Sequence, residues 1–250
     1  MGRRRRILRF DAAGVWGHDR IMWFDPPATP TPWDDAIRHL LGADDRLARV
    51  IHRVGPCTMA PRRDYFVALC KAIFSQQLST VVAATIFSRF RDLFPNRRPT
   101  PELVLRAIAA DPETVRRCGL SRPKLAYIKD LAEHFASGAI PTRRLCRMSD
   151  QEVIDALVSV KGVGRWTAEM FLMFVLNRPD VLPVDDLGVR VGVQDIFGLP
   201  QRPTPKEVLA LAEPWRPYRS IATWYVWRRN ANADVTPIVA VKEKSIRQSR

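Results

Sequence analysis

Apolar residues recur with a helical period along most of the chain. Behind Asp64, a residue type that often caps helices, Phe66, Leu69, Cys70 and Ile73 follow at i, i+3, i+4 and i+7. This spacing places the four apolar side chains on one face of a helix. No segment shows the sustained alternation of a half-buried β-strand, so the pattern predicts an all-α fold.

Capping residues mark the helix boundaries as clearly as the periodicity does. The segments "SDQE" at 149–152 and "TPKE" at 204–207 are capping boxes, in which a hydroxyl group and a glutamate satisfy amides at the start of a helix. Other helices are predicted to begin at Trp33, Ser79, Asp111 and Ser121. The helix behind Ser79 carries a predicted apolar stripe of Val82, Ile86, Phe90 and Phe94. A last helix is predicted over 218–232, and four prolines between 26 and 32 predict a loop.

The bulk composition bounds the kind of partner. The 250 residues are 46% hydrophobic, and 40 basic against 26 acidic side chains give a formal net charge of +14. A basic surplus of this size favours a polyanionic partner, most often nucleic acid, although a merely basic soluble protein has the same balance. The length is sufficient for one sizeable core or for two smaller subdomains.

The sequence carries no recognisable targeting or metal-binding motif. Its four cysteines include no CxxC pair, and its four histidines lie without ligand spacing, so we expect neither a disulfide framework nor a thiolate metal site. The basic start "MGRRRRILRF" has no apolar region behind it, and no stretch is apolar enough to span a membrane. We therefore expect a cytosolic or nucleoid-associated protein with no membrane partner.

The segment "VKGVGRWTA" predicts a tight hairpin between two helices, because Gly162 and Gly164 leave little chain for anything else. Without side chains at these positions a phosphate can approach the backbone, where the amides of the glycines and of the next helix are donors. Lys161 and Arg165 flank the hairpin. Such a clamp holds nucleic acid without sequence preference.

An ordinary helix connection can also need glycine for its geometry alone, and a bare GxG pattern is weak. The fuller pattern is a capping box, an apolar helix, K-G-V-G, a basic residue and a second apolar helix. This combination favours the nucleic-acid interpretation.

Four segments in order resemble one family. The hairpin region at 157–174, "LVSVKGVGRWTAEMFLMF", resembles the helix-hairpin-helix DNA glycosylase superfamily, specifically its 3-methyladenine DNA glycosylase II (alkylbase) branch. "ALCKAIFSQQLS" at 68–79 resembles the family's helix and DNA-wedge loop, and "LPVDDLGVRVG" at 182–192 its catalytic segment. "WRPYRSIATWYVWR" at 215–228 resembles its C-terminal pocket helix. The resemblance covers about 62–230.

The resemblance implies two helical subdomains on either side of a DNA-binding cleft. We assign residues 79–186 to a central subdomain containing the helix-hairpin-helix at 149–176, and residues 61–78 with 187–250 to the other. Residues 1–60 form an N-terminal arm and helix whose role stays open. Longer relatives carry an extra β-rich N-terminal domain, for which this chain is expected to be too short.

Two adjacent acids, Asp185 and Asp186, follow the hairpin. In the family, an aspartate at this place stabilises the oxocarbenium-like sugar as the base leaves, and it can orient or activate water. The alkyl-base branch matches Asp186 without a gap, whereas the "PVD" of the oxidised-guanine branch selects Asp185. We predict Asp186 as the catalytic acid and Asp185 as a helix cap. Capping alone also explains an acid pair before a helix.

Bifunctional relatives place a lysine at the position of Trp166, and its amine attacks the sugar. Trp166 offers no such nucleophile, so the resemblance implies a monofunctional enzyme that uses water and leaves an abasic site. The faces of Trp166 and Trp227 can attract a cationic alkylated base by about 0.5–2 kcal/mol. Met170, one turn beyond Trp166, is expected to line the same pocket. The alternative for these side chains is core packing, which we expect for Trp224.

Extrusion of a base costs unstacking energy, which an inserted side chain offsets. By the family match, Gln77 occupies the wedge position, with Leu78 as the alternative. The resemblance further implies a monovalent cation on the backbone carbonyls of Val158, Val160 and Val163, and no required cofactor. The four-cysteine iron–sulfur pattern of other branches is missing.

Together these inferences predict a DNA glycosylase of base excision repair that acts as a monomer on duplex DNA. It would hydrolyse the N-glycosidic bond of alkylated purines such as 3-methyladenine and 7-methylguanine. The expected location is the cytoplasm and nucleoid of a bacterium or the nucleus of a eukaryote. The alternatives are action on hypoxanthine, uracil or oxidised bases, a glycosylase that also cleaves the strand as a lyase, and a non-catalytic helix-hairpin-helix DNA-binding module.

Overall fold

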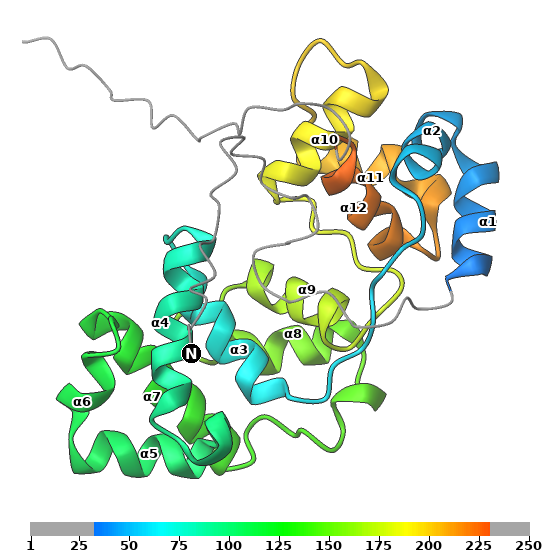
Figure 1. Ribbon diagram of the computed structural model, residues 1–250. Coiled ribbons are helices and arrows are strands. Elements are labelled where there is room, and N and C mark those ends of the chain that lie inside the picture. The colour runs from blue at the N-terminus through cyan, green and yellow to red at the C-terminus, as the bar shows by residue number, and fades with distance from the viewer. Residues whose placement is uncertain (1–32, 231–250) are drawn as a thin grey trace, which may run out of the picture.

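The computed structural model describes residues 33–230, which form α-helices and short 3-10 turns with no β-strand among them. The predicted all-α fold is therefore confirmed. Figure 1 shows the helices in two groups, one built around the hairpin and one around the two ends of the described chain. We call them the hairpin group and the terminal group.

The hairpin group consists of consecutive helices. Its members are α3 (Tyr65–Ser75), α4 (Thr80–Asp92), α5 (Pro101–Ala110), α6 (Pro112–Arg116), α7 (Arg122–Ala136), α8 (Asp150–Val158) and α9 (Arg165–Phe174), with the 3-10 turns η1 (Pro95–Arg97) and η2 (Leu145–Arg147). Helix α3 packs against α4, α7 and α9, and α8 packs against α9. A cluster of phenylalanines fills the space between α3 and α4, with the Phe74 ring centroid 4.9 Å from that of Phe90.

The terminal group joins segments far apart in the sequence. Its members are α1 (Asp34–Ala43), α2 (Asp45–Val54), α10 (Leu187–Phe197), α11 (Pro205–Leu211) and α12 (Arg219–Arg228), with the 3-10 turn η3 (Glu213–Trp215). Helix α12 packs against α2 and α10, which buries Leu47, Tyr225 and Trp215 almost completely. The Tyr225 hydroxyl donates to the Gly55 carbonyl at 2.9 Å and ties α12 to the end of α2.

Helix α3 belongs to the hairpin group. The sequence assignment had placed residues 61–78 with the terminal helices, but the main partners of α3 are α4, α7 and α9. The physical reason is that α3 is apolar nearly all round, with eight of its eleven residues buried, so it needs cover on several faces. Residues 55–64 and 175–186 connect the groups, and the Arg62 amide donates to the Val175 carbonyl at 2.9 Å where these segments meet.

The helix starts follow the predicted capping chemistry. Both predicted capping boxes form, at Ser149 with Glu152 and at Thr204 with Glu207. Ser79 caps α4 and Ser121 caps α7 through their side chains. The helix predicted over 218–232 is shorter, because α12 ends at Arg228; residues 231 and 232 lie outside the described part.

Candidate catalytic and DNA-binding site

Asp186 stands at the start of α10, where the chain enters the terminal group. Its Oδ1 accepts the Val189 amide at 2.7 Å, so Asp186 is the N-cap of the helix. The prediction that Asp185 would be the cap is wrong. Asp185 is exposed and lies one residue before the cap position, whereas the half-buried Asp186 turns its carboxylate over the first turn of α10.

Two indoles hold the same carboxylate from different elements. Trp166, on the first turn of α9, donates its Nε1–H to Asp186 Oδ2 at 2.7 Å. Trp227, near the end of α12, donates its Nε1–H to Asp186 Oδ1 at 2.9 Å. The three residues thus converge from α9, the start of α10 and α12, and both donors fix the orientation of the carboxylate.

The packing around Trp227 leaves little freedom for its ring. The Phe174 ring stacks on it, with centroids 5.9 Å apart and an interplanar angle of 28°. A Cβ added at Gly188 would lie 3.1 Å from Asp186 Oδ1 and 3.1 Å from Trp227 Cδ1, so a glycine there lets α10 approach the indole. One face of Trp227 is therefore occupied, and only its other face could contact a base.

A buried ion pair anchors the helix that carries Trp227. Arg219, at the start of α12, donates to both oxygens of Asp180, at 2.7 Å from Nε and 2.8 Å from Nη2. The guanidinium is almost fully buried, so this two-point contact fixes α12 against the connection 175–186. The contact holds the first turn of α12, and Trp227 lies near the other end of the same helix.

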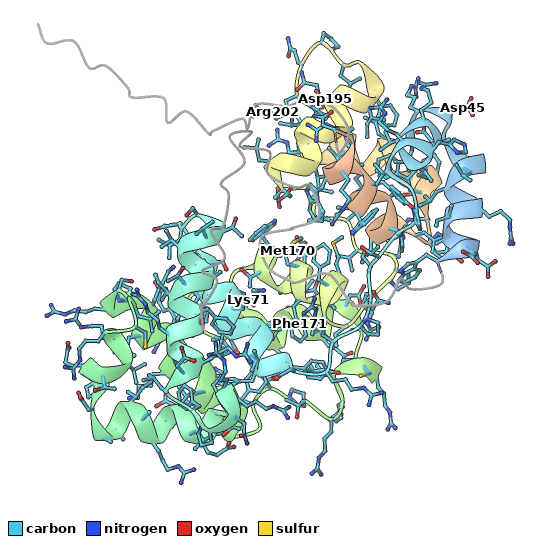
Figure 2. All side chains as sticks on the ribbon, in the orientation of Figure 1. Asp45, Lys71, Met170, Phe171, Asp195 and Arg202 are labelled. Atoms are coloured by element: carbon cyan, nitrogen blue, oxygen red, sulfur yellow. The ribbon has the colours of Figure 1, made fainter. Side chains whose placement is uncertain are left out.

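Met170 does not have the surroundings expected of an open pocket wall. Only 2% of its surface is exposed, and every residue from 167 to 174 of α9 is buried. Figure 2 shows Met170 on α9, in the region between the two groups of helices. Helical spacing from Trp166 did not predict the burial of Met170, because neighbouring helices cover α9 on nearly all sides. Trp224, expected in the core, is buried, and the Arg228 guanidinium lies 3.8 Å from its ring centroid.

The hairpin between α8 and α9 needs glycine for two separate reasons. Gly162 has φ of +82°, the left-handed region that disfavours other residues. In addition, a Cβ at this position would lie 2.4 Å from the Tyr127 ring of α7. Gly164 has nothing within 4 Å of an added Cβ, and as N-cap of α9 it supplies no side-chain acceptor. The start of α9 is thus left without a side-chain cap, unlike the starts of α8 and α10.

The hairpin lysine is engaged by an acid that the sequence analysis missed. Asp130 of α7 accepts the Lys161 amide at 2.9 Å, and its Oδ1 lies 3.3 Å from the Lys161 ammonium. Burial alone would raise the pKa of Asp130, but the hydrogen bonds and charge of Lys161, together with His134, lower it below its usual value. The Lys161 amide is therefore used within the protein, while its exposed ammonium stays near the hairpin surface.

Arg165 has an acidic partner on its own helix. Its Nε lies 3.0 Å from Glu169 Oε1, one turn along α9. Burial raises the pKa of Glu169, and the Arg165 guanidinium opposes that rise. The i,i+4 spacing in "RWTAE" was the available sequence signal for this pair. Most of the Arg165 side chain remains exposed at the hairpin, where a phosphate could reach it.

The turn between α3 and α4 presents Gln77. This residue is exposed and adopts φ of +58°, an uncommon conformation for a residue other than glycine. Leu78 is half-buried beside it. The structure therefore turns Gln77, rather than Leu78, outward at the apex.

Within the described chain, no group of three or more His, Cys, Asp or Glu side chains is arranged to hold a metal ion. None of the described helices is long and apolar enough to cross a membrane. A surface cavity of about 570 Å³ lies beside the loop between α10 and α11, lined among others by Leu199, Arg202 and Glu207. It contains none of the three residues that converge at Asp186.

In the described residues, the fold and the site combine an all-helical architecture, a helix-hairpin-helix and a carboxylate that caps α10 and is bound by two indoles. Residues 70–217 match the HhH-GPD superfamily base excision DNA repair proteins. The chain is 40% identical to DNA-3-methyladenine glycosylase 1 of Schizosaccharomyces pombe, over 82% of this chain and 91% of that protein. The chain therefore belongs to the HhH-GPD superfamily of base excision DNA repair proteins, as the sequence resemblance indicated.

Solved structures agree with this assignment. A Schizosaccharomyces pombe 3-methyladenine DNA glycosylase in complex with abasic DNA superposes with a TM-score of 0.70 at 40% identity, covering 81% of this chain and 100% of that one. A DNA-3-methyladenine glycosidase from Bacillus halodurans gives the same TM-score at 31% identity, covering 84% of this chain and 94% of that one.

Proposed function

We propose that this protein is a monofunctional DNA glycosylase that hydrolyses the N-glycosidic bond of alkylated purines extruded from duplex DNA. The observation that carries the proposal is the Asp186 carboxylate, held by the indole N–H groups of Trp166 and Trp227 beside the hairpin. The similarity to 3-methyladenine DNA glycosylases supports the substrate class.

The contacts of Asp186 distinguish its two oxygens. Oδ1 already accepts the Val189 amide and the Trp227 indole, which use both of its lone-pair directions. Oδ2 accepts only the Trp166 indole among the contacts found, so it retains an acceptor position. Oδ2 is therefore the oxygen placed to face the sugar or to take a hydrogen bond from the attacking water.

The reaction follows from this arrangement. As the C1′–N bond of the nucleotide breaks, positive charge develops on the sugar, and the fixed carboxylate stabilises it. A cationic alkylated purine takes the bond electrons and leaves as a neutral base. Water adds to C1′ and loses a proton, which leaves an abasic site. Trp166 has no amine, so no Schiff base forms and the strand stays intact.

The hairpin would supply the grip on the strand. The start of α9 has no side-chain cap, so its partial positive charge is available to a phosphate. Gly164, where an added Cβ would meet open space, keeps a side chain away from that place, and the exposed heads of Lys161 and Arg165 add positive charge. These contacts would not depend on the base sequence of the DNA, as an enzyme that searches DNA for damage requires.

We also propose that the hairpin binds a monovalent cation. The carbonyls of Val158, Val160 and Val163 would hold it, and a neutral set of backbone oxygens suits such an ion. The Val160 carbonyl accepts the Val163 amide at 3.0 Å, which leaves it a second lone pair. The ion would stiffen the turn that presents the Gly164 and α9 amides.

The test is the release of free base from methylated duplex DNA by the wild type, Asp186→Asn and Asp185→Asn. We expect release by the wild type, a loss of about 10²- to 10⁴-fold for Asp186→Asn, and little change for Asp185→Asn. DNA binding should persist in all three. Borohydride should trap no covalent adduct. Equal activity of the Asp186 variant and the wild type would refute the role of Asp186. No release by the wild type would refute the substrate class, and a panel of other damaged bases would then identify the substrate.

A further inference from the structure

Several side chains outside the catalytic contacts meet at the turn between α3 and α4. Helix α3 ends at Ser75, and Gln77 at the apex of the turn has φ of +58°. A left-handed residue other than glycine persists only where the surrounding structure holds it. The turn itself contains no glycine, so the question is which contacts keep it in place.

Lys124 of α7 forms hydrogen bonds with the backbone of the turn. Its Nζ donates to the carbonyl of Phe74 at 2.8 Å and to the carbonyl of Gln76 at 2.6 Å. Carbonyls at the end of a helix lack intrahelical partners and carry partial negative charge, which an ammonium group complements. Partial burial lowers the pKa of Lys124, and the two carbonyls accept hydrogen bonds from its ammonium group.

The same turn is tied to the hairpin. The Gln76 side chain donates from Nε2 to the Gly162 carbonyl at 2.7 Å, 86 residues along the chain. Gly162 rests against the ring of Tyr127, and Asp130 accepts the Lys161 amide at 2.9 Å. Lys124, Tyr127 and Asp130 are successive steps on one face of α7. This face therefore supports the turn at one end and the hairpin at the other.

We propose that Lys124 and Gln76 are positioning residues that lock the Gln77 turn to the hairpin, so that the grip on the phosphate and the extrusion of the base act as one rigid unit. The inference rests on the proposed function, because it concerns how that enzyme opens the duplex. Without these contacts the turn could move away from the hairpin. Insertion of Gln77 into the base stack would then displace the turn and leave the base stacked.

The decisive variants are Lys124→Met and Gln76→Leu, which keep side-chain size and remove the donors. The controls are Lys129→Met and Gln151→Leu. Lys129 is exposed on the same helix and forms an ion pair with Glu133, and Gln151 donates a hydrogen bond to Asp155 on α8. Single-turnover release of 7-methylguanine is measured from a duplex with cytosine opposite the lesion and from one with a mismatched thymine, where unpairing costs less.

We expect both variants to slow release from the paired duplex by about 10- to 100-fold and from the mismatched duplex by less than about 5-fold. The controls should stay near wild type on both. A purely structural role would slow both substrates by the same factor, so equal losses overturn the inference. Unchanged rates on the paired duplex overturn it as well. If Lys124→Met does not fold, Gln76→Leu on the surface turn decides alone.

A second readout does not depend on turnover. 2-Aminopurine beside a tetrahydrofuran abasic-site analogue reports opening of the stack when the wild type binds. We expect a fluorescence rise with the wild type and the controls, and less than about half of it with Lys124→Met or Gln76→Leu at saturating protein. Wild-type signal from the variants overturns the inference. If the wild type opens the stack, the two variants do not, and no base is released, the proposed function is contradicted while the coupling is supported.

Discussion

The carboxylate site and the hairpin differ in which part of the chain forms them: side chains at the first, backbone at the second. At Asp186 the proposed chemistry depends on side chains from α9, the start of α10 and α12, which meet across the two groups of helices. At the hairpin the surface proposed to face a phosphate is backbone, where Gly164 leaves open space and Gly162 fits against the Tyr127 ring by having no side chain. Substitution should therefore damage rate at the first region and shape or binding at the second.

The two regions nevertheless share one element. Helix α9 begins at the hairpin and carries Trp166 on its first turn, so the backbone that would hold a phosphate also places a donor on Asp186. If the proposed roles hold, the start of α9 links the phosphate contact directly to the carboxylate. Variants that change base release and DNA binding separately test this link.

The largest effect is expected from separating the two roles of Asp186. Asp186→Ser keeps an N-cap oxygen for α10 and removes the carboxylate, whereas Asp186→Ala removes both. We expect both variants to lose about 10²- to 10⁴-fold in single-turnover base release. Only Asp186→Ala should also lose about 0.5–2 kcal/mol of unfolding free energy in a denaturant titration. Retained activity in Asp186→Ser would show that the carboxylate serves only as a cap.

The next effect concerns the indole donors. Oδ1 keeps the Val189 amide when Trp227 loses its N–H, but Oδ2 loses the one donor found for it when Trp166 does. We expect Trp166→Phe to slow base release by about 10- to 100-fold, the equivalent of about 1.5–3 kcal/mol for a hydrogen bond to a charged group. Trp227→Phe should cost less. The reverse order in single-turnover rates would contradict the assignment of Oδ2 as the working oxygen.

At the hairpin, Gly162→Ala should affect the fold itself. The added methyl group meets the Tyr127 ring at 2.4 Å and the backbone has φ of +82°. We expect a loss of about 2–4 kcal/mol in unfolding free energy, measured by denaturant titration. Gly138→Ala is the matched control, because φ there is +78° with nothing within 4 Å. It should lose only about 1 kcal/mol. Similar losses in both variants would mean that the Tyr127 contact yields easily.

The smallest effect is expected at the flanking charge. Arg165→Gln removes one exposed cation, so the slope of log Kd against log salt should fall by about 1 while base release at saturating enzyme changes little. Arg38→Gln, an exposed arginine of α1 paired with Asp35, should leave the slope unchanged. Equal slopes for Arg165→Gln and the wild type in a binding titration would show that Glu169 keeps this guanidinium from the phosphate.

Local features were predictable where neighbours in sequence decide them. The capping boxes at Ser149 and Thr204 form as expected, because both partners lie within one turn. The face of a helix that packs against its neighbours is less predictable. The spacing places Val82 in the apolar stripe of α4, yet 44% of Val82 is exposed, while Ala83 and Phe87 are buried. The side of α4 that packs is set by α3, which the periodicity of α4 alone does not contain.

The amino-acid sequence by itself determined the helical class, most helix starts, the glycine hairpin and the family, because these depend on short-range spacing and on motifs. Only the tertiary structure decided that Asp186 is both cap and indole acceptor, that Met170 is buried, and that Asp130, Lys124 and Gln76 hold the hairpin and the turn. Apart from the cap contact of Asp186 with Val189, each of these facts depends on how different helices pack together. Such contacts are set by the packing of whole helices, which local spacing does not specify.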